Sequence, residues 1–237
     1  LGSQLLTVED LNAFYGSSQV LFDVSIDVGD NEVVGIFGRN GMGKTTLLDS
    51  LVNRIDRKTG RVTYDGEDIS EWSTHDIISE RIAYVPEGRE IYPALTVREN
   101  LELATPSGVP DDVREDRVQN VFGQFERLGE RESQRGGTLS GGEQQMLAIG
   151  RGLVSDPDLL LLDEPTEGLA PAIIDDVVEI LESLVAGDRA VLIVEQNIKR
   201  MLPLIDRGYM IQTGQIVEEG DSTYLSDEEI HEQYLTV

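Results

Sequence analysis

The strongest constraint on the fold of this chain is the segment Gly38-Arg39-Asn40-Gly41-Met42-Gly43-Lys44-Thr45. It follows a continuous apolar run, Val33 to Phe37, which predicts a buried strand, and it leads into a run that predicts a helix from Gly43 to Val52. In this context the spacing G-x-x-x-x-G-K-[ST] is typical of a phosphate-binding loop, whose backbone N–H groups surround phosphate oxygens at the start of a helix. A plain glycine-rich turn with this spacing arises by chance on the order of once per hundred chains of this length.

The side chains of this loop suit a nucleoside triphosphate and Mg²⁺. Lys44 has the length to reach the β- and γ-phosphates, and the Thr45 hydroxyl can ligate Mg²⁺. We therefore expect ATP to be held by one contiguous set of residues: Gly38, Arg39, Asn40, Gly41, Met42, Gly43, Lys44, Thr45 and Thr46.

A second apolar run, Leu159 to Leu162, ends in two carboxylates, Asp163 and Glu164, and a third run covers Ala190 to Val194. Strands that are apolar on both faces favour a parallel sheet covered by helices, and ligands bind at the carboxyl ends of such strands. We expect Asp163 to hold Mg²⁺, directly or through water, and Glu164 to act as the general base on the attacking water. The alternative for this pair alone is a strand that ends in surface acids.

The remaining segments complete an α/β domain. Short β-rich runs with turn signals between residues 5 and 34 predict an antiparallel sheet. Residues of about 95–155 are rich in charge and predict a mainly helical insertion. Near the end, Ser226 and Glu229 have the spacing of a capping box and predict the start of a short helix.

A second glycine-rich helix start lies at Leu139-Ser140-Gly141-Gly142-Glu143-Gln144, ahead of a helix with one apolar face. Such a start exposes N–H groups that suit an anion. The plain alternative is an ordinary helix that Ser140 caps. Two separate loops can hold one ATP only if they converge on it.

Over nearly its whole length the chain resembles the nucleotide-binding domain of ABC transporters, whose signature is L-S-G-G-[QE]. The resemblance implies an α/β fold with a RecA-like P-loop core and a mostly parallel sheet, an N-terminal antiparallel β subdomain and a helical insertion. It implies one domain over 4–237, with an α/β core at 4–86 and 156–237 and a helical subdomain at 87–155 that carries the signature.

The resemblance also implies partners. In that family the signature closes over the γ-phosphate of ATP held by the opposite subunit, a role that falls here on Ser140, Gly142 and Glu143, with Gly141 between them. It implies a homodimer, or a heterodimer with a related ATPase, that forms with ATP. Integral membrane permease subunits would hold this dimer at the cytoplasmic face of the cell membrane.

Within the family the chain is most similar to the ATPases of branched-chain amino acid importers and of related amide or urea importers. Four segments carry this similarity: Val85 to Arg89, Leu139 to Arg151, Glu164 to Pro171 and Val194 to Asn197. The main alternative is an ABC ATPase that serves DNA repair, translation or cluster assembly and is not attached to a transporter. Repair members insert long coiled coils, a pattern that this sequence lacks.

Further positions take their roles from the resemblance. Tyr15 stands where the family places a ring that stacks on adenine, unless it is an ordinary hairpin tyrosine. Glu87 occupies the place of a glutamine that senses Mg²⁺, and its carboxylate can ligate the ion. Gln196 replaces a histidine near the γ-phosphate; it can donate a hydrogen bond but does not exchange a proton at neutral pH, so we assign the base to Glu164. Ala170 stands at a usual aspartate, which puts one contact between subunits in doubt.

The segment from Glu87 to Asn100 connects the expected Mg²⁺ site to the helical insertion. We expect Ile91, Tyr92 and Leu95 to line a groove for a cytoplasmic helix of a membrane partner. The alternative is that these three side chains belong to the core of the insertion.

The composition excludes several classes of protein. The chain has 45 Asp and Glu against 19 Lys and Arg, a formal net charge of −26 and no cysteine. Nucleic acid is therefore not an expected partner, because phosphate binding demands a basic face, and disulfide frameworks and thiolate metal sites are excluded. The acids are spread along the whole chain, which indicates either a surface adapted to a very salty cytoplasm or an ordinary acidic protein.

The salt-adapted interpretation makes a prediction about stability. Dilution from molar to millimolar KCl removes the screening of like charges, so the chain should lose secondary structure that circular dichroism detects. An unchanged spectrum at low salt would leave the ordinary acidic protein as the explanation.

Overall fold

The computed structural model describes residues 4–185, 187 and 189–234, and its centre is a six-stranded sheet. Only the β9–β10 pair within this sheet is antiparallel, and the pairs that involve β3, β6, β7 and β8 are parallel. The strands lie in the order β10 (Gln215–Asp221), β9 (Arg207–Gln212), β3 (Val33–Phe37), β8 (Ala190–Glu195), β7 (Leu159–Asp163) and β6 (Ile82–Val85). The predicted mostly parallel sheet is therefore confirmed, with its three apolar runs side by side.

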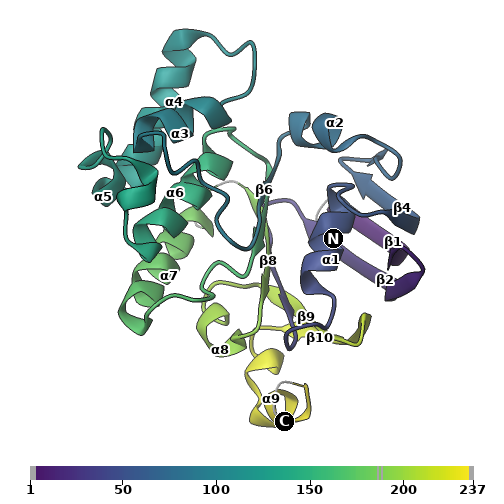
Figure 1. The fold of residues 1–237 in the computed structure, drawn as a ribbon. Helices are drawn as coiled ribbons and strands as arrows, with labels where there is room; N and C mark the ends of the chain where they lie inside the picture. The colour runs from purple at the N-terminus through teal and green to yellow at the C-terminus, as the bar shows by residue number, and fades with distance from the viewer. Residues whose placement is uncertain (1–3, 186, 188, 235–237) are drawn as a thin grey trace.

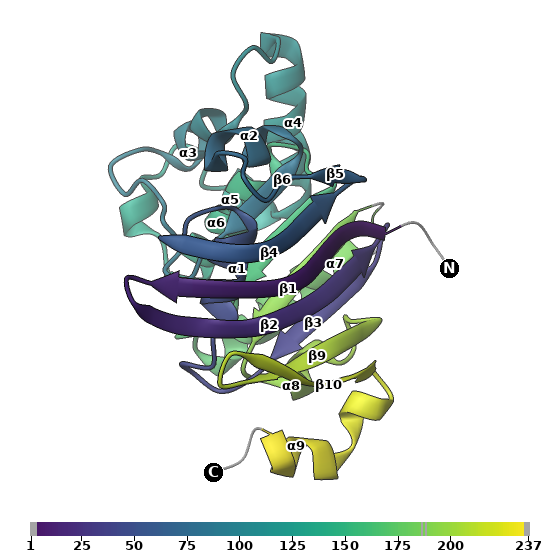
Figure 2. The same ribbon diagram turned by 90° about the vertical axis from the view of Figure 1, so that its right-hand side faces the viewer.

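A second, antiparallel sheet contains the N-terminal strands that the sequence predicted. Its order is β2 (Ser18–Gly29), β1 (Gln4–Tyr15), β4 (Arg57–Tyr64) and β5 (Glu67–Asp68). Figure 2 views this sheet from outside, and helix α1 (Lys44–Leu51) lies behind it. The sequence did not predict β4, because its exposed half is polar and lacks a continuous apolar run.

The six-stranded sheet separates two hydrophobic cores. Alternate residues of each central strand point to opposite faces, so Val34 and Ile36 join one core while Val33 and Phe37 join the other. The first core contains α1 and the antiparallel sheet. The second contains the helices on the other side, which Figure 1 shows with the sheet nearly edge on.

The predicted helical stretch is broken into several helices. It holds α3 (Val97–Ala104), α4 (Asp111–Gln124), α5 (Glu126–Gly129), the short η1 (Gly136–Thr138) and α6 (Gly141–Leu153). The other helices are α2 (Thr74–Ser79), α7 (Pro171–Val185), α8 (Ile198–Met201), η2 (Tyr224–Ser226) and α9 (Glu228–Tyr234). Among the described residues no helix has the length and apolarity that a membrane span requires.

The prediction for the start of the last helix was wrong by one residue. The Ser226 hydroxyl donates to the carbonyl oxygen of Thr223 at 2.6 Å, inside the preceding 3₁₀ turn. The carboxylate of Asp227 accepts instead from the backbone N–H of Glu229 at 2.9 Å. Asp227 therefore caps α9, since its short acidic side chain competes well for the same N–H groups.

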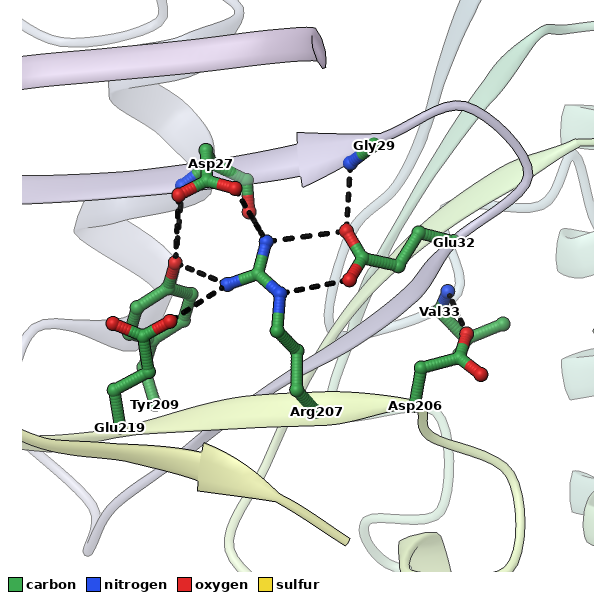
Figure 3. Close-up of polar contacts among 8 residues, drawn as sticks. All are labelled: Asp27, Gly29, Glu32, Val33, Asp206, Arg207, Tyr209 and Glu219. Carbon is green, nitrogen blue, oxygen red and sulfur yellow. Dashed lines mark hydrogen bonds and ion pairs between the residues drawn. The ribbon is translucent and has the colours of Figure 1, made fainter. Parts of the chain in front are cut away.

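One arginine joins β9 to the turn between β2 and β3 (Figure 3). The Arg207 guanidinium donates to Asp27 Oδ2 at 2.5 Å, to Glu32 Oε1 at 2.7 Å and to Glu219 Oε1 at 3.1 Å. The Tyr209 hydroxyl donates to Asp27 Oδ1 at 3.2 Å. The side chain of Arg207 is only 18% exposed, so a single cation forms ion pairs with three carboxylates in a partly buried place.

Removal of this cation should destabilise the fold. Arg207→Met should lower the free energy of unfolding in urea by about 3 kcal/mol, because it leaves three neighbouring carboxylates without their cation. The control is Arg200→Met, which breaks an exposed ion pair with Asp175 and should cost less than about 1 kcal/mol. Equal losses of unfolding free energy in the two variants would show that the Arg207 cluster stabilises the fold no more than an exposed ion pair does.

Candidate functional site

The phosphate-binding loop lies between the end of β3 at Phe37 and the start of α1 at Lys44. Gly43, directly before the helix, has φ of +104°, and a Cβ there would lie 2.8 Å from the side chain of Leu21. A Cβ on Gly38 would lie 2.4 Å from the carbonyl oxygen of Ile211. Both positions therefore require glycine, the first for its left-handed backbone and both for close packing.

Lys44 is buried inside this loop, where its charge is fully paired. Its ammonium donates to the carbonyl oxygens of Gly38 at 2.8 Å and Arg39 at 3.1 Å, and its Nζ lies 2.9 Å from Glu164 Oε1. The structure thus brings Lys44 of the phosphate-binding loop into contact with Glu164, the second residue of the Asp163–Glu164 pair.

Asp163 ends β7 beside the first turn of α1. The Thr45 hydroxyl donates to its Oδ1 at 3.2 Å, and the Tyr84 hydroxyl donates to its Oδ2 at 3.1 Å. Burial raises the pKa of Asp163, the hydrogen bonds from Tyr84 and Thr45 counteract it, and the nearby charge of Glu164 adds to the rise. Two of the oxygen ligands predicted for Mg²⁺, on Thr45 and Asp163, are therefore adjacent.

This donor set fits Mg²⁺ as a partner of bound phosphates. Mg²⁺ prefers oxygen ligands and is usually held by one or two carboxylates together with substrate phosphates and water. No group of three His, Cys, Asp or Glu side chains in the described part of the chain could hold a metal by itself. The backbone of Glu87 also lowers the pKa of Asp163, so the backbone of a third predicted ligand residue lies near the same carboxylate.

Glu164 has an unusual backbone and a buried side chain. Its φ is +45°, in the left-handed region, and its N–H donates to the carbonyl oxygen of Val194 at 2.9 Å. Burial raises the pKa of its carboxyl group, Lys44 counteracts that rise, and Glu167 adds to it. A carboxyl group with a raised pKa is suited to accept a proton near neutral pH.

Two cavities meet at Glu164. One, of about 260 Å³, is lined by the phosphate loop and the first turn of α1, including Lys44 and Thr45. The other, of about 490 Å³, lies between the segment 87–93 and α6 and includes Glu87 and Gln144. Glu164 therefore stands between the space at the phosphate loop and the space beside α6.

The structure places Gln196, Tyr15 and Ser140 at the surface and buries Gly142. Gln196 is exposed in the loop after β8, and Tyr15 is 44% exposed at the end of β1. Ser140 caps α6: its hydroxyl accepts from the N–H of Glu143 at 3.4 Å, while the Glu143 carboxylate accepts from the Ser140 N–H at 2.8 Å. Gly142 faces α7 so closely that a Cβ would lie 2.1 Å from the Ile173 side chain.

The two glycine-rich helix starts belong to opposite faces of the central sheet. The apolar residues Leu47 and Leu48 of α1 pack into the core shared with the antiparallel sheet, whereas Met146 and Leu147 of α6 pack into the other core. Figure 1 shows α1 and α6 on the two sides of the sheet. Within one chain, the first loop is thus joined to the acid pair, and the second loop begins a helix that packs on the other face of the sheet.

Sequence reasoning missed two polar side chains at this edge of the sheet. Tyr84 contacts Asp163 from β6, and Glu195 at the end of β8 accepts hydrogen bonds from Thr166. The only available signal was position, because each residue lies within or at the end of an apolar run that leads to the same edge of a parallel sheet.

Comparisons with known proteins agree with this geometry. The sequence profile of the ABC transporter family matches residues 21–167. The high-affinity branched-chain amino acid transport ATP-binding protein BraG of Pseudomonas aeruginosa is 42% identical over 98% of this chain and 99% of its own length. The lipopolysaccharide export system ATP-binding protein LptB of Haemophilus influenzae is 33% identical over 98% and 97%.

A solved structure supports the same assignment. An ATP-binding cassette of an ABC transporter in its ADP conformation superposes with a TM-score of 0.79 at 28% identity, over 97% of this chain and 98% of that one. The resemblance that the motifs indicated is therefore confirmed, including the similarity to branched-chain amino acid ATPases. The chain belongs to the ABC transporter family, in which it is an ATP-binding subunit that hydrolyses ATP.

Proposed function

We propose that this chain drives an importer of branched-chain amino acids or of related small amides. The observation that carries this proposal is the 42% identity to a branched-chain amino acid transport protein along nearly the whole of both chains. A urea or short-amide importer is the nearest alternative. Because the chain is also 33% identical to a lipopolysaccharide export protein, import as the direction of transport is part of the proposal. An ABC ATPase that is not attached to a transporter is the remaining alternative.

The chemistry falls on the residues around β7. Lys44 lies in the loop that would hold the β- and γ-phosphates, and Glu164, which contacts it at 2.9 Å, would accept the proton of the attacking water. Thr45 and Asp163 would hold Mg²⁺, with Glu87 next to them, and bound Mg²⁺ would neutralise charge on the β- and γ-oxygens. Gln196 would donate a hydrogen bond close to the γ-phosphate.

The Lys44–Glu164 ion pair indicates how nucleotide prepares the base. Lys44 has no second carboxylate within ion-pair distance in the described part of the chain, so phosphate oxygens compete with Glu164 for the same ammonium. Transfer of Lys44 to the phosphates would free the Glu164 carboxylate for the water. Tyr15, exposed at the end of β1, would stack on the adenine ring.

We propose that the signature loop acts on the ATP of a second subunit. Ser140, Gly141, Gly142 and Glu143 start α6 on the opposite face of the sheet from α1, which favours a pair of subunits in which each loop meets the other's phosphates. Loss of the γ-phosphate contact would then open the pair. The sister subunit is this chain or a related ATPase, and membrane permease subunits would hold both at the cytoplasmic face of the membrane.

The proposed base can be tested directly. Glu164→Gln should keep ATP binding, lower turnover by a factor of about 10²–10⁴ and accumulate an ATP-loaded dimer in size-exclusion chromatography. Lys44→Ala is the matched control, because it should lose ATP affinity and so fail to form the dimer. Turnover of Glu164→Gln close to the parent rate would remove Glu164 from the role of base.

We further propose that residues 87–100 couple hydrolysis to the permease. The buried Asn100 holds this segment: its amide accepts from the N–H of Tyr92 at 2.8 Å and donates to the Tyr92 and Thr96 carbonyl oxygens at 3.0 and 2.8 Å. Arg151 of α6 stacks on the Tyr92 ring at 4.7 Å. Tyr92 is nevertheless 45% exposed, whereas Ile91 is partly buried against the core, so Tyr92 is the better candidate for a partner contact.

A charge at Tyr92 tests the coupling. Tyr92→Glu should abolish transport in reconstituted complexes and leave basal ATPase near the parent rate, because a charged carboxylate would replace the aromatic ring at the permease contact. The control is Tyr224→Glu, which places the same charge at a tyrosine with 44% exposure near the C-terminus and should leave both rates unchanged. Normal transport by Tyr92→Glu would contradict the prediction that Tyr92 lines a groove for a permease helix.

The division into subdomains at residues 87 and 155 also stays a proposal, which the grouping of α3 to α6 supports. The same is true of adaptation to high salt, for which the net charge of −26 and the scarcity of lysine, three residues in the chain, are the support.

A further inference from the structure

One buried carboxylate takes no part in the mechanism described above. Glu195 ends β8, one residue before Gln196, and only 3% of the residue is exposed. A buried carboxylate needs partners, since an isolated ion is costly to remove from water. The partners of Glu195 therefore indicate what it is for.

All three partners of this carboxylate are donors. Its Oε1 accepts from the backbone N–H of Thr166 at 2.9 Å and from the Thr166 hydroxyl at 2.7 Å. Its Oε2 accepts from the backbone N–H of Gln196 at 3.2 Å. A carboxylate, which accepts at both oxygens, satisfies this set, whereas an amide of the same shape has one acceptor and would place an NH₂ group against at least one donor.

The contacts of Glu195 secure a strained turn. Thr166 lies two residues after Glu164, whose φ of +45° is unfavourable for a residue with a side chain. The turn is fixed at its start by the bond from the Glu164 N–H to the carbonyl oxygen of Val194, and at its end by Thr166 on Glu195. Adjacent residues at the end of β8 thus hold both ends of the turn that presents Glu164.

We propose that Glu195 is a positioning residue for ATP hydrolysis, which holds the turn of Glu164 and the peptide of Gln196 in one arrangement. It acts through Glu164 and does not touch nucleotide itself. The proposal rests on the role proposed for Glu164. A fixed base matters because catalytic groups lose much of their effect when they move by about 1 Å.

Glu195→Gln is the decisive variant. It keeps the size of the side chain and loses at least one of the three hydrogen bonds, so kcat should fall on the order of 100-fold while KM for ATP stays near the parent value. Glu182→Gln, which removes the same charge from an exposed position on α7, should leave kcat and KM unchanged. Thermal unfolding followed by circular dichroism should show that Glu195→Gln is folded at the assay temperature.

Two further comparisons separate positioning from general stability. Thr166→Val should lower kcat in the same way, and Thr166→Ser, which keeps the hydroxyl, should recover it. In single-turnover assays, adding Glu195→Gln to Glu164→Gln should not lower the residual rate further, because the positioned base is already absent.

The outcomes distinguish this proposal from the role of Glu164. A Glu195→Gln enzyme with the parent kcat overturns the positioning role, even if Glu164→Gln is inactive. A further loss of residual rate in the double variant, or a fall in kcat that appears only with a rise in KM and loss of structure, also overturns it. If Glu164→Gln itself keeps the parent rate, the proposal that Glu164 is the general base is overturned.

Discussion

The structure depends on charges buried at one edge of its central sheet. In the described part of the chain the buried charged side chains are Lys44, Asp163, Glu164 and Glu195, and they come from α1, β7, the residue after β7, and β8. Lys44 forms an ion pair with Glu164, whereas Asp163 accepts hydrogen bonds from Thr45 and Tyr84, and Glu195 accepts them from Thr166. The parallel strands bring these groups together, and the deficit of positive charge prepares the site for Mg²⁺.

Much of this fold could be predicted from uninterrupted apolar runs. The strand predicted from Val33 to Phe37 and the runs that begin at Leu159 and Ala190 became adjacent strands because such runs are buried on both faces. The polar strand β10 and the half-exposed β4 carried no such signal and were missed, since their pairing is decided by long-range contacts. The wrong prediction of Ser226 as the cap shows that residue spacing alone does not identify a capping residue, because the neighbouring Asp227 was an equally suitable acceptor.

The candidate site, like the fold, has residues that the sequence predicted and residues that it did not. Lys44, Thr45, Asp163 and Glu164 could be predicted, because a phosphate loop and an acidic strand end have short patterns with a known physical purpose. Tyr84 and Glu195 could not be, because they are joined to the site by hydrogen bonds across strands. The sequence also did not show that Lys44 pairs with Glu164, a contact that depends on the geometry of the turn after β7.

The close packing of Gly142 has a consequence for communication between subunits. The turn that carries Glu164 leads within a few residues into α7, and the first turn of α7 places Ile173 where a side chain at position 142 would be. A shift of that turn therefore presses on the loop that, in the proposed pair, reaches the sister molecule. In the proposed pair, this steric contact would connect the turn that carries each subunit's Glu164 with the loop that reaches its neighbour's catalytic centre.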